Sequence, residues 1–251
     1  MEKCSNCGAL FSGKYCNTCG QEKVTERLQT GYLIKQAVHG IFHWESSIFY
    51  TFYELLIRPG EVISNYIKGR RKPYVKPIAY FIFIQALYVL TILWISSVKP
   101  EKNFSAFNII SYGSNIESEN TQIHNVVNST VKYYIFVVPL LFAVFLKLYT
   151  SKQNNLNYAE SAVFSFYAFG NMLVFQIITL LASLYIESIW NAGFILIYIY
   201  LSYAIINFSG YRLIKGILTG ALIIVSSLIS FQILMAVFQF VYFTFFFHPK
   251  L

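Results

Sequence analysis

Aspartate is absent from this sequence, so all eleven acidic side chains are glutamates. Histidine occurs only four times, and no cysteine follows Cys19. An enzyme that acts on lipids would need a nucleophile, or a cluster of His and Asp, at membrane depth. The sequence offers neither, and we therefore predict a protein without enzymatic activity and without catalytic residues.

Charge is scarce as well, because only 12% of the residues are charged, while 56% are hydrophobic and 19% aromatic. This composition is typical of an integral membrane protein. The expected fold is mainly α, a polytopic membrane protein in which each long apolar run can cross a hydrocarbon core of about 30 Å. The five predicted spans lie at about residues 77–98, 133–149, 159–185, 190–208 and 217–247, with an outer loop over 99–132.

The distribution of Lys and Arg predicts the orientation, because cytoplasmic loops carry the excess of these residues. Most of them precede the first span or lie in the loops after the second and fourth spans. Only Lys99, Lys102, Lys132 and Lys250 lie on the other side. We therefore expect a cytoplasmic N-terminus and an external C-terminus. The net charge of +8 then reflects topology, and we do not expect nucleic-acid binding.

The four cysteines form two Cys-x-x-Cys pairs, Cys4 with Cys7 and Cys16 with Cys19, and a glycine follows each pair. Two such turns supply the four thiolates of a closed tetrahedral site, the usual geometry of structural Zn²⁺. A disulfide pair would need an oxidising compartment, and a redox dithiol would need only one such motif. We therefore predict a zinc ribbon over residues 1–23, whose metal replaces the core that so short a segment lacks.

Residues 24–76 are neither ribbon nor span. Their apolar spacing predicts helices over about 30–43 and 45–57, and a third over Pro59–Lys68, where Pro59 starts the helix and Gly69 ends it. These helices are too short to cross a membrane. We expect them to be amphipathic, lying at the cytoplasmic interface or packing beneath the transmembrane domain of residues 77–251.

The densest positive charge lies just before the first span. Near a membrane surface each basic residue contributes about 1 kcal/mol to binding of anionic lipid. This cluster predicts a site for anionic lipid head groups or for a cytoplasmic protein partner, although an anchor that only sets topology would look the same. The candidate residues are Arg58, Lys68, Arg70, Arg71, Lys72 and Lys76.

His39 and His43 have the spacing of two metal ligands on one helix face, but no carboxylate completes the pattern, and we interpret them as packing residues. Asn103 and Asn128 begin glycosylation sequons, which have meaning only in a secretory compartment.

One resemblance is visible at this point. The segment Tyr15–Gln21, with its second cysteine pair, precedes the pattern Arg-Pro-Gly…Gly-x-Arg…Tyr over Arg58–Tyr74, and Pro77 follows at the first span. This combination resembles an uncharacterised bacterial membrane family, the domain-of-unknown-function family numbered 3667, over about residues 1–95. The resemblance implies a short zinc ribbon joined to several spans in a bacterial inner (cytoplasmic) membrane. It implies no activity.

Polar residues within the spans mark either helix contacts or a path for a solute. Hydrogen bonding between neighbouring helices is the simpler interpretation, and Gln232 and Gln239 follow a heptad-like spacing. The candidates are Gln85, Glu160, Asn171, Gln232 and Gln239.

Together these features predict a non-enzymatic membrane protein whose cytoplasmic ribbon and basic segment dock a partner or regulate the helical bundle. The alternative is a homo-oligomeric channel or membrane effector, for example an accessory of a bacterial defence system. A carrier is disfavoured, because five spans cannot form two equal inverted repeats.

Overall fold

The computed structural model describes residues 1–24, 27–34, 47–99, 134–186 and 189–246. The part described is mainly helical, as predicted. Of the helix expected over about 30–43, residues 30–34 are helical and the remainder lies outside the described residues, together with His39, His43 and both sequons. The elements are β1 (Glu2–Lys3), β2 (Leu10–Phe11), α2 (Ser47–Ile57), α3 (Pro59–Ile67), α4 (Pro77–Val98), α6 (Tyr134–Asn154), α7 (Tyr158–Ala182), α8 (Ile189–Ser209) and α9 (Leu213–Phe246).

The N-terminal ribbon consists of two hairpin-like loops. Strands β1 and β2 pair antiparallel, with Glu2 opposite Phe11, and an isolated bridge joins Tyr15 to Glu22. The glycine after each cysteine pair has a positive φ, 78° at Gly8 and 73° at Gly20. Residues with a Cβ rarely adopt this conformation, so glycine permits the two turns to close in the same way.

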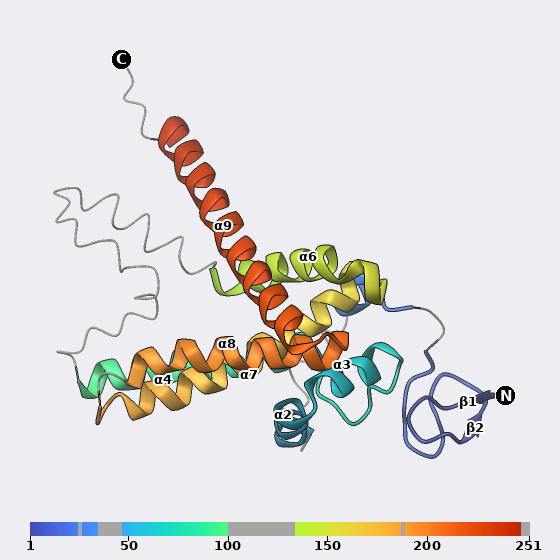
Figure 1. The fold of residues 1–251 in the computed structure, drawn as a ribbon. Coiled ribbons are helices and arrows are strands. Elements are labelled where there is room, and N and C mark those ends of the chain that lie inside the picture. The colour runs from blue at the N-terminus through green and yellow to red at the C-terminus, as the bar shows by residue number, and fades with distance from the viewer. Residues whose placement is uncertain (25–26, 35–46, 100–133, 187–188, 247–251) are drawn as a thin grey trace.

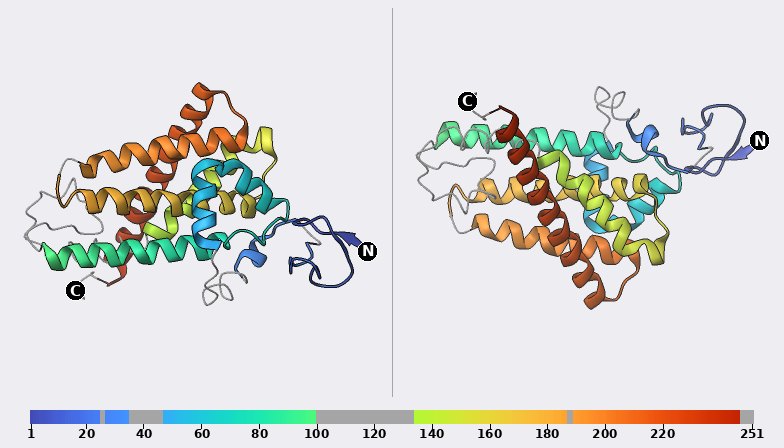
Figure 2. Two further views of the ribbon diagram at one scale, coloured as in Figure 1. Left: turned by 90° about the horizontal axis from the view of Figure 1, so that it is seen from below. Right: turned by 90° about the horizontal axis from the view of Figure 1, so that it is seen from above.

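The long helices form two layers. Helices α4, α7 and α8 lie side by side with α7 in the centre, while α6 and α9 cross one face of this layer and α2 and α3 cover part of the other (Figure 2). The ribbon lies at the end of the layer where α4 begins (Figure 1). Buried aromatic side chains fill the contact near that end, and the rings of Tyr66 and Tyr80 both pack against Tyr167.

Five helices occupy the five predicted spans, but they differ in apolar length. Four are long and apolar enough to cross a membrane: Pro77–Val98, Tyr158–Ala182, Ala192–Ser209 and Leu213–Val237. The apolar part of α6 is shorter, Phe136–Thr150 among the described residues. The prediction of about five spans is therefore approximate, while the prediction of a polytopic α-helical membrane protein is confirmed.

Close backbone contact joins α8 to α9. Gly216 and Gly220 have the spacing that permits two helices to approach closely. A Cβ added to Gly216 would lie 2.1 Å from the side chain of Ile206, and one added to Gly220 would lie 3.4 Å from the hydroxyl of Ser202. The two glycines therefore hold α9 against α8.

Helix α2 runs across the layer of long helices (Figure 2). The hydroxyl of Thr51 accepts a hydrogen bond from the backbone N–H of Val75 just before α4, at 3.0 Å. At its other end, the hydroxyl of Tyr200 on α8 donates to the carbonyl of Leu55 at 3.1 Å. Because Thr51 and Leu55 face the layer, the aromatic side chains of Phe49 and Tyr53 are exposed on the outer face.

Candidate metal centre and its junction with the membrane domain

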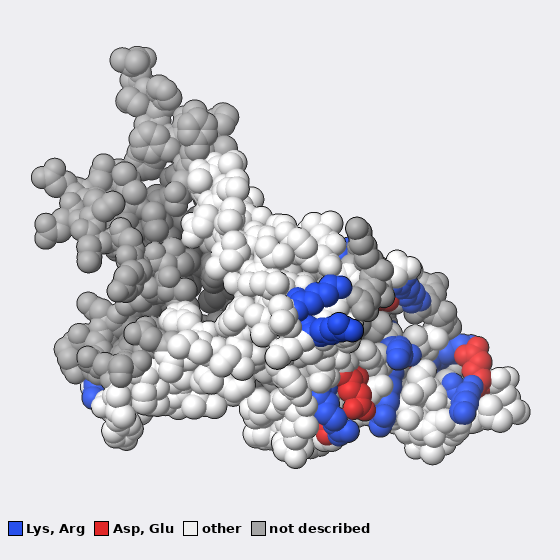
Figure 3. All heavy atoms as spheres, in the orientation of Figure 1, with Lys and Arg blue, Asp and Glu red and all other residues white. Residues whose placement is uncertain are grey.

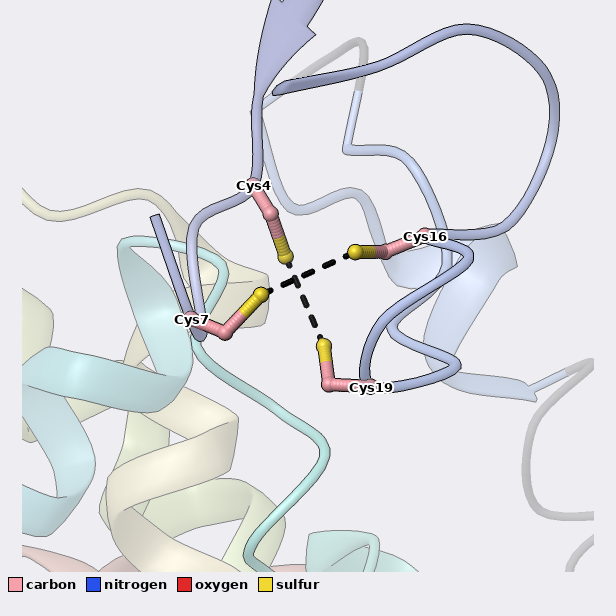
Figure 4. A group of neighbouring side chains, drawn as sticks. All are labelled: Cys4, Cys7, Cys16 and Cys19. Carbon is pink, nitrogen blue, oxygen red and sulfur yellow. Dashed lines mark hydrogen bonds between the residues drawn. The ribbon is translucent and has the colours of Figure 1, made fainter. Parts of the chain in front are cut away.

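The four cysteines converge on one point between the two ribbon loops (Figure 4). Their sulfur atoms all lie within 4.8 Å of one another, with 3.6 Å between Cys4 and Cys19 and 3.7 Å between Cys7 and Cys16. Adjacent sulfurs of a tetrahedral site with metal–sulfur bonds of about 2.3 Å are about 3.8 Å apart. A disulfide would need about 2.05 Å, and all four cysteines are free thiols. The arrangement therefore fits one metal ion.

Polar groups of the ribbon stabilise negative charge on the sulfurs. The side chain of Asn6 and the backbone N–H of Gln21 lower the pKa of Cys19 to about 6. Backbone N–H groups of Cys19 and Thr18 likewise lower the pKa of Cys16. Although the Ala9 N–H acts in the same direction on Cys7, burial and the neighbouring sulfurs outweigh it and raise its pKa to about 12. Without a cation the four sulfurs compete for negative charge, and a bound metal ion removes this competition.

Burial in the ribbon centres on the same site. Cys4 and Cys16 are buried with Phe11, which covers one side of the cluster as its place between the pairs suggests. Tyr15 is exposed instead, and the ammonium group of Lys14 lies 5.5 Å from its ring. Because three buried residues are a very small core, a metal ion bound by the cysteines would be the main source of stability for this segment.

Gln21 joins the ribbon to the loop between α3 and α4, residues 68–76, which we call the basic loop. Its side chain is only 5% exposed, and its carbonyl oxygen accepts hydrogen bonds from the backbone N–H groups of Arg71, at 3.1 Å, and Lys72, at 2.8 Å. Gly69 in the same loop lies close to Ser5 and Val24, because a Cβ placed there would be 3.1 Å from the Val24 side chain. Residues of the first cysteine turn and residues that follow the second thus contact the loop that leads into α4.

A second junction links the segment after the ribbon to the start of α7. The guanidinium of Arg27 donates two hydrogen bonds to the carboxylate of Glu160, which is 3% exposed, and a third to the carbonyl of Asn155 at 2.7 Å. Glu160 also accepts from the backbone N–H of Asn157 and thereby completes the capping box of α7. Glu160 was predicted as an intramembrane polar residue, and its contacts are those of a helix cap paired with a cation.

Two arginines of the basic cluster are held by other side chains. Arg58 binds Glu54 at 2.9 Å and Glu61 at 3.5 Å. Arg71 lies with its guanidinium 4.8 Å from the Tyr32 ring and 5.6 Å from the Tyr66 ring, so both arginines have structural contacts. Arg58 is nevertheless exposed, as are Lys68, Arg70 and Lys72, whereas Arg71 and Lys76 are half-buried.

Charged side chains gather toward the ribbon end of the molecule, over the ribbon, α2, α3 and the nearby ends of the long helices, while the rest of the visible surface of these helices is almost free of them (Figure 3). This separation agrees with the charge asymmetry seen in the sequence.

The remaining polar candidates lie in different surroundings. Asn171 on α7 accepts a hydrogen bond from the hydroxyl of Tyr80 on α4, so it joins two helices as expected. Gln85 is buried on α4, and among the described residues its amide has no hydrogen-bond partner. Gln232 is exposed on α9, and the side chain of Gln239 lies outside the described part.

Sequence reasoning missed three residues: Gln21, Arg27 and Gln176. Gln176 is buried on α7 with an amide that, like that of Gln85, has no partner in the described part of the chain. Of these three residues, Gln21 could have been identified from its position, because it directly follows the second cysteine turn. The partners of Arg27 and Gln21 lie 133 and 50 residues away, and no local pattern indicates such pairs.

Fold and site together define a polytopic helical membrane protein with a four-cysteine cluster that can bind a metal ion. Residues 45–89 match the model of a family described as "Protein of unknown function (DUF3667)", the family that the sequence pattern resembles. The match covers α2, α3, the basic loop and the first part of α4, while the ribbon lies outside it. Comparison with curated proteins and with solved structures gave no match.

Proposed function

We propose that the protein is a non-enzymatic regulator of a membrane assembly, in which a structural Zn²⁺ ribbon positions a basic docking surface on the helical bundle. The observation that carries this proposal is the double junction of the ribbon: Gln21 binds the backbone of the basic loop, and Arg27 binds Glu160 at the start of α7. Since α7 is the central helix of the layer, folding of the ribbon is coupled to the core of the bundle.

Zinc is the metal that four thiolates in a closed tetrahedron favour. No ligand position remains open for water, so the ion supplies folding energy and no catalysis. Metal binding would fix Gln21 and Ser5 against the loop, because both lie within two residues of a ligand cysteine.

The docking surface consists of Lys68, Arg70 and Lys72, which stay exposed while Arg58 and Arg71 are held by other side chains. Positive side chains at the cytoplasmic end of a bundle attract anionic lipid head groups and acidic protein surfaces. We place this end in the cytoplasm and the bundle in a bacterial inner membrane, since Lys and Arg gather on the cytoplasmic side of membrane proteins.

Removal of zinc tests the coupling. Purified protein in detergent should contain one zinc per chain, and a chelator, mild acid or Cys16→Ser should release it, since protons compete for the thiolates. We expect trypsin then to cut faster after Lys68 and Arg70, and added zinc to restore protection in the wild type alone.

The control is Ser12→Ala, an exposed ribbon position away from the cysteines. It should retain zinc and normal protection. If the metal-free protein is cut at the same rate as the zinc form, the ribbon does not regulate this surface. Retention of zinc by Cys16→Ser would show that the metal site itself is wrong.

The alternative function, an oligomeric pore or membrane effector, has one observation in its favour. Gln85 and Gln176 are buried among span helices, and their amides lack hydrogen-bond partners among the described residues. Such groups cost free energy unless water or a solute satisfies them. Ion flux from liposomes containing the full chain would favour this function, and a Gln176→Leu variant with unchanged flux would exclude that residue from the path.

A further inference from the structure

Helix α9 has two faces with different surroundings. One face packs on α6 and α8, and it carries Gly216, Gly220, Ile223, Ser227 and Phe231, all of them buried. The helix then leaves the bundle (Figure 1). Only 22% of the most apolar 18-residue stretch of α9 is buried, against 67% of the corresponding stretch of α7.

The opposite face of α9 carries an uninterrupted 4–3 repeat. Leu218, Leu222, Val225 and Ile229 are each more than half exposed, and they follow one another at intervals of four, three and four residues. This is the spacing of the a and d positions through which two α-helices pair along a seam. The repeat continues with the exposed residues Gln232 and Ala236, and in the sequence with Gln239.

An apolar repeat alone would suit lipid as well as a helix, and Gln232 distinguishes the two. It lies in the middle third of the 34-residue helix, and no hydrogen bond of its side chain occurs within the described part of the chain. Hydrocarbon can neither donate to an amide nor accept from it, so an exposed Gln at this depth is costly. A neighbouring helix with a polar side chain at the same level removes that cost.

A second copy of this chain meets the requirement without further assumptions. In a parallel pair related by a two-fold axis each residue at the seam faces its own equivalent. A Gln amide is self-complementary, because it carries both a donor and an acceptor. The small side chain of Ala236 one turn further on permits close approach at this level.

We propose that α9 is a dimerisation helix, which pairs in parallel with α9 of a second copy along the seam Leu218, Leu222, Val225, Ile229, Gln232 and Ala236. The two Gln232 amides form hydrogen bonds with each other across the two-fold axis. They thereby fix the register of the two helices, as a single polar residue in the seam does in coiled coils. The proposal concerns a surface remote from the ribbon and goes beyond the proposed function.

The first test measures self-association of the full-length protein in lipid vesicles by energy transfer between labelled copies as lipid is added. The wild type should form dimers, and Gln232→Leu should associate about 3- to 20-fold more weakly, the range expected for hydrogen bonds between membrane helices. Because Gln232 is exposed, this substitution leaves the core of the monomer intact. A monomeric wild type, or equal association of the variant, would overturn the proposal.

Cysteine cross-linking tests the seam independently of stability. Ile229→Cys lies on the seam, whereas Leu234→Cys is exposed on the opposite side of the helix and serves as the matched control. We expect oxidative cross-linking of membranes to yield dimers with Ile229→Cys above the level of the wild type, and none with Leu234→Cys. Equal cross-linking at both positions, or more at Leu234→Cys, would place the contact elsewhere.

Discussion

Gln21 is the residue on which the position of the ribbon depends most directly. Its single carbonyl oxygen accepts from two successive backbone N–H groups, while its own NH₂ group donates to the carbonyl of Glu22 at 3.0 Å. One buried side chain therefore accepts hydrogen bonds from two backbone N–H groups that lie outside any helix or strand. Because Gln21 follows Cys19 by two residues, a metal ion bound by Cys19 would also fix the direction of the Gln21 side chain.

We expect Gln21→Ala to release the ribbon from the loop while leaving the metal bound. Two hydrogen bonds are lost, each worth about 1 kcal/mol, and none of the four sulfur ligands changes. Zinc content should remain one per chain, and tryptic cleavage in the basic loop should accelerate. Asn17→Ala, in the exposed part of the second cysteine turn, is the control. Loss of zinc from Gln21→Ala would contradict this division between ligation and docking.

The Arg27–Glu160 pair combines a half-exposed cation with a buried carboxylate. Removal of Arg27 leaves that carboxylate with the capping-box contacts alone, and we expect Arg27→Ala to lower the free energy of unfolding by about 1–3 kcal/mol, since water screens part of the pair. Glu160→Gln keeps an acceptor for the helix cap and should cost less.

A double-mutant cycle decides whether the two residues act together. With Glu160→Gln in place, a further change of Arg27 should cost much less than it does in the wild type. The measurement is thermal unfolding in one detergent for all four proteins. Additive effects would mean that the two side chains stabilise the protein separately.

At the scale of elements, local signals predicted the helices well. Pro59 and Gly69 bracket α3, and the apolar run from Pro77 to Val98 coincides with α4. Both predictions rest on chemistry within a few residues of the helix ends. The outward face of α2 was not predictable, because its aromatic residues surround the helix and only contacts with Val75 and Tyr200 select the face that is buried.

The metal site and the junctions show the same contrast between features that local sequence predicts and features that distant contacts decide. Ligand spacing indicated the cysteine cluster because all four thiols lie within sixteen consecutive residues. The sequence groups Glu160 and Gln232 with the other polar residues of the spans, whereas the structure pairs Glu160 with the distant Arg27 and leaves Gln232 exposed on α9. Tertiary contact, which periodicity does not encode, decides these environments.

Contact between α3 and α8 depends on Gly60. A Cβ added there would lie 2.4 Å from the carbonyl carbon of Asn207, a backbone atom that cannot move aside. We expect Gly60→Ala to destabilise the protein by about 1–3 kcal/mol or more through overpacking, measured as a lower Tm in detergent. Gly31→Ala, with no atom within 4 Å of the added Cβ, is the matched control and should leave the Tm unchanged or slightly higher. An equal Tm for the two variants would mean that α3 does not pack on α8.

For the whole molecule, the short apolar part of α6 raises the question of how many times the chain crosses the membrane. Two contacts place the turns. Arg27 binds Asn155 and Glu160 on either side of the α6–α7 turn, and the hydroxyl of Tyr211, between α8 and α9, donates to the carbonyl of Tyr149 near the end of α6. Both turns therefore lie at the ribbon end of the bundle.

From the ribbon end, α7 runs to the opposite end of the bundle, α8 runs back, and α9 runs to the opposite end again. The end of α9 therefore lies on the side opposite the ribbon. The chain must also return between α4 and α7, and α6 is the described helix that does so even though its apolar part is short. We therefore predict that a reporter fused after Gly210 is cytoplasmic and that one fused after Leu251 is external, as read by paired reporters active on only one side of the membrane. A cytoplasmic signal at Leu251 together with one at Gly210 would mean that α9 does not cross, and α9 would then lie along the membrane surface with its exposed seam in the head-group region.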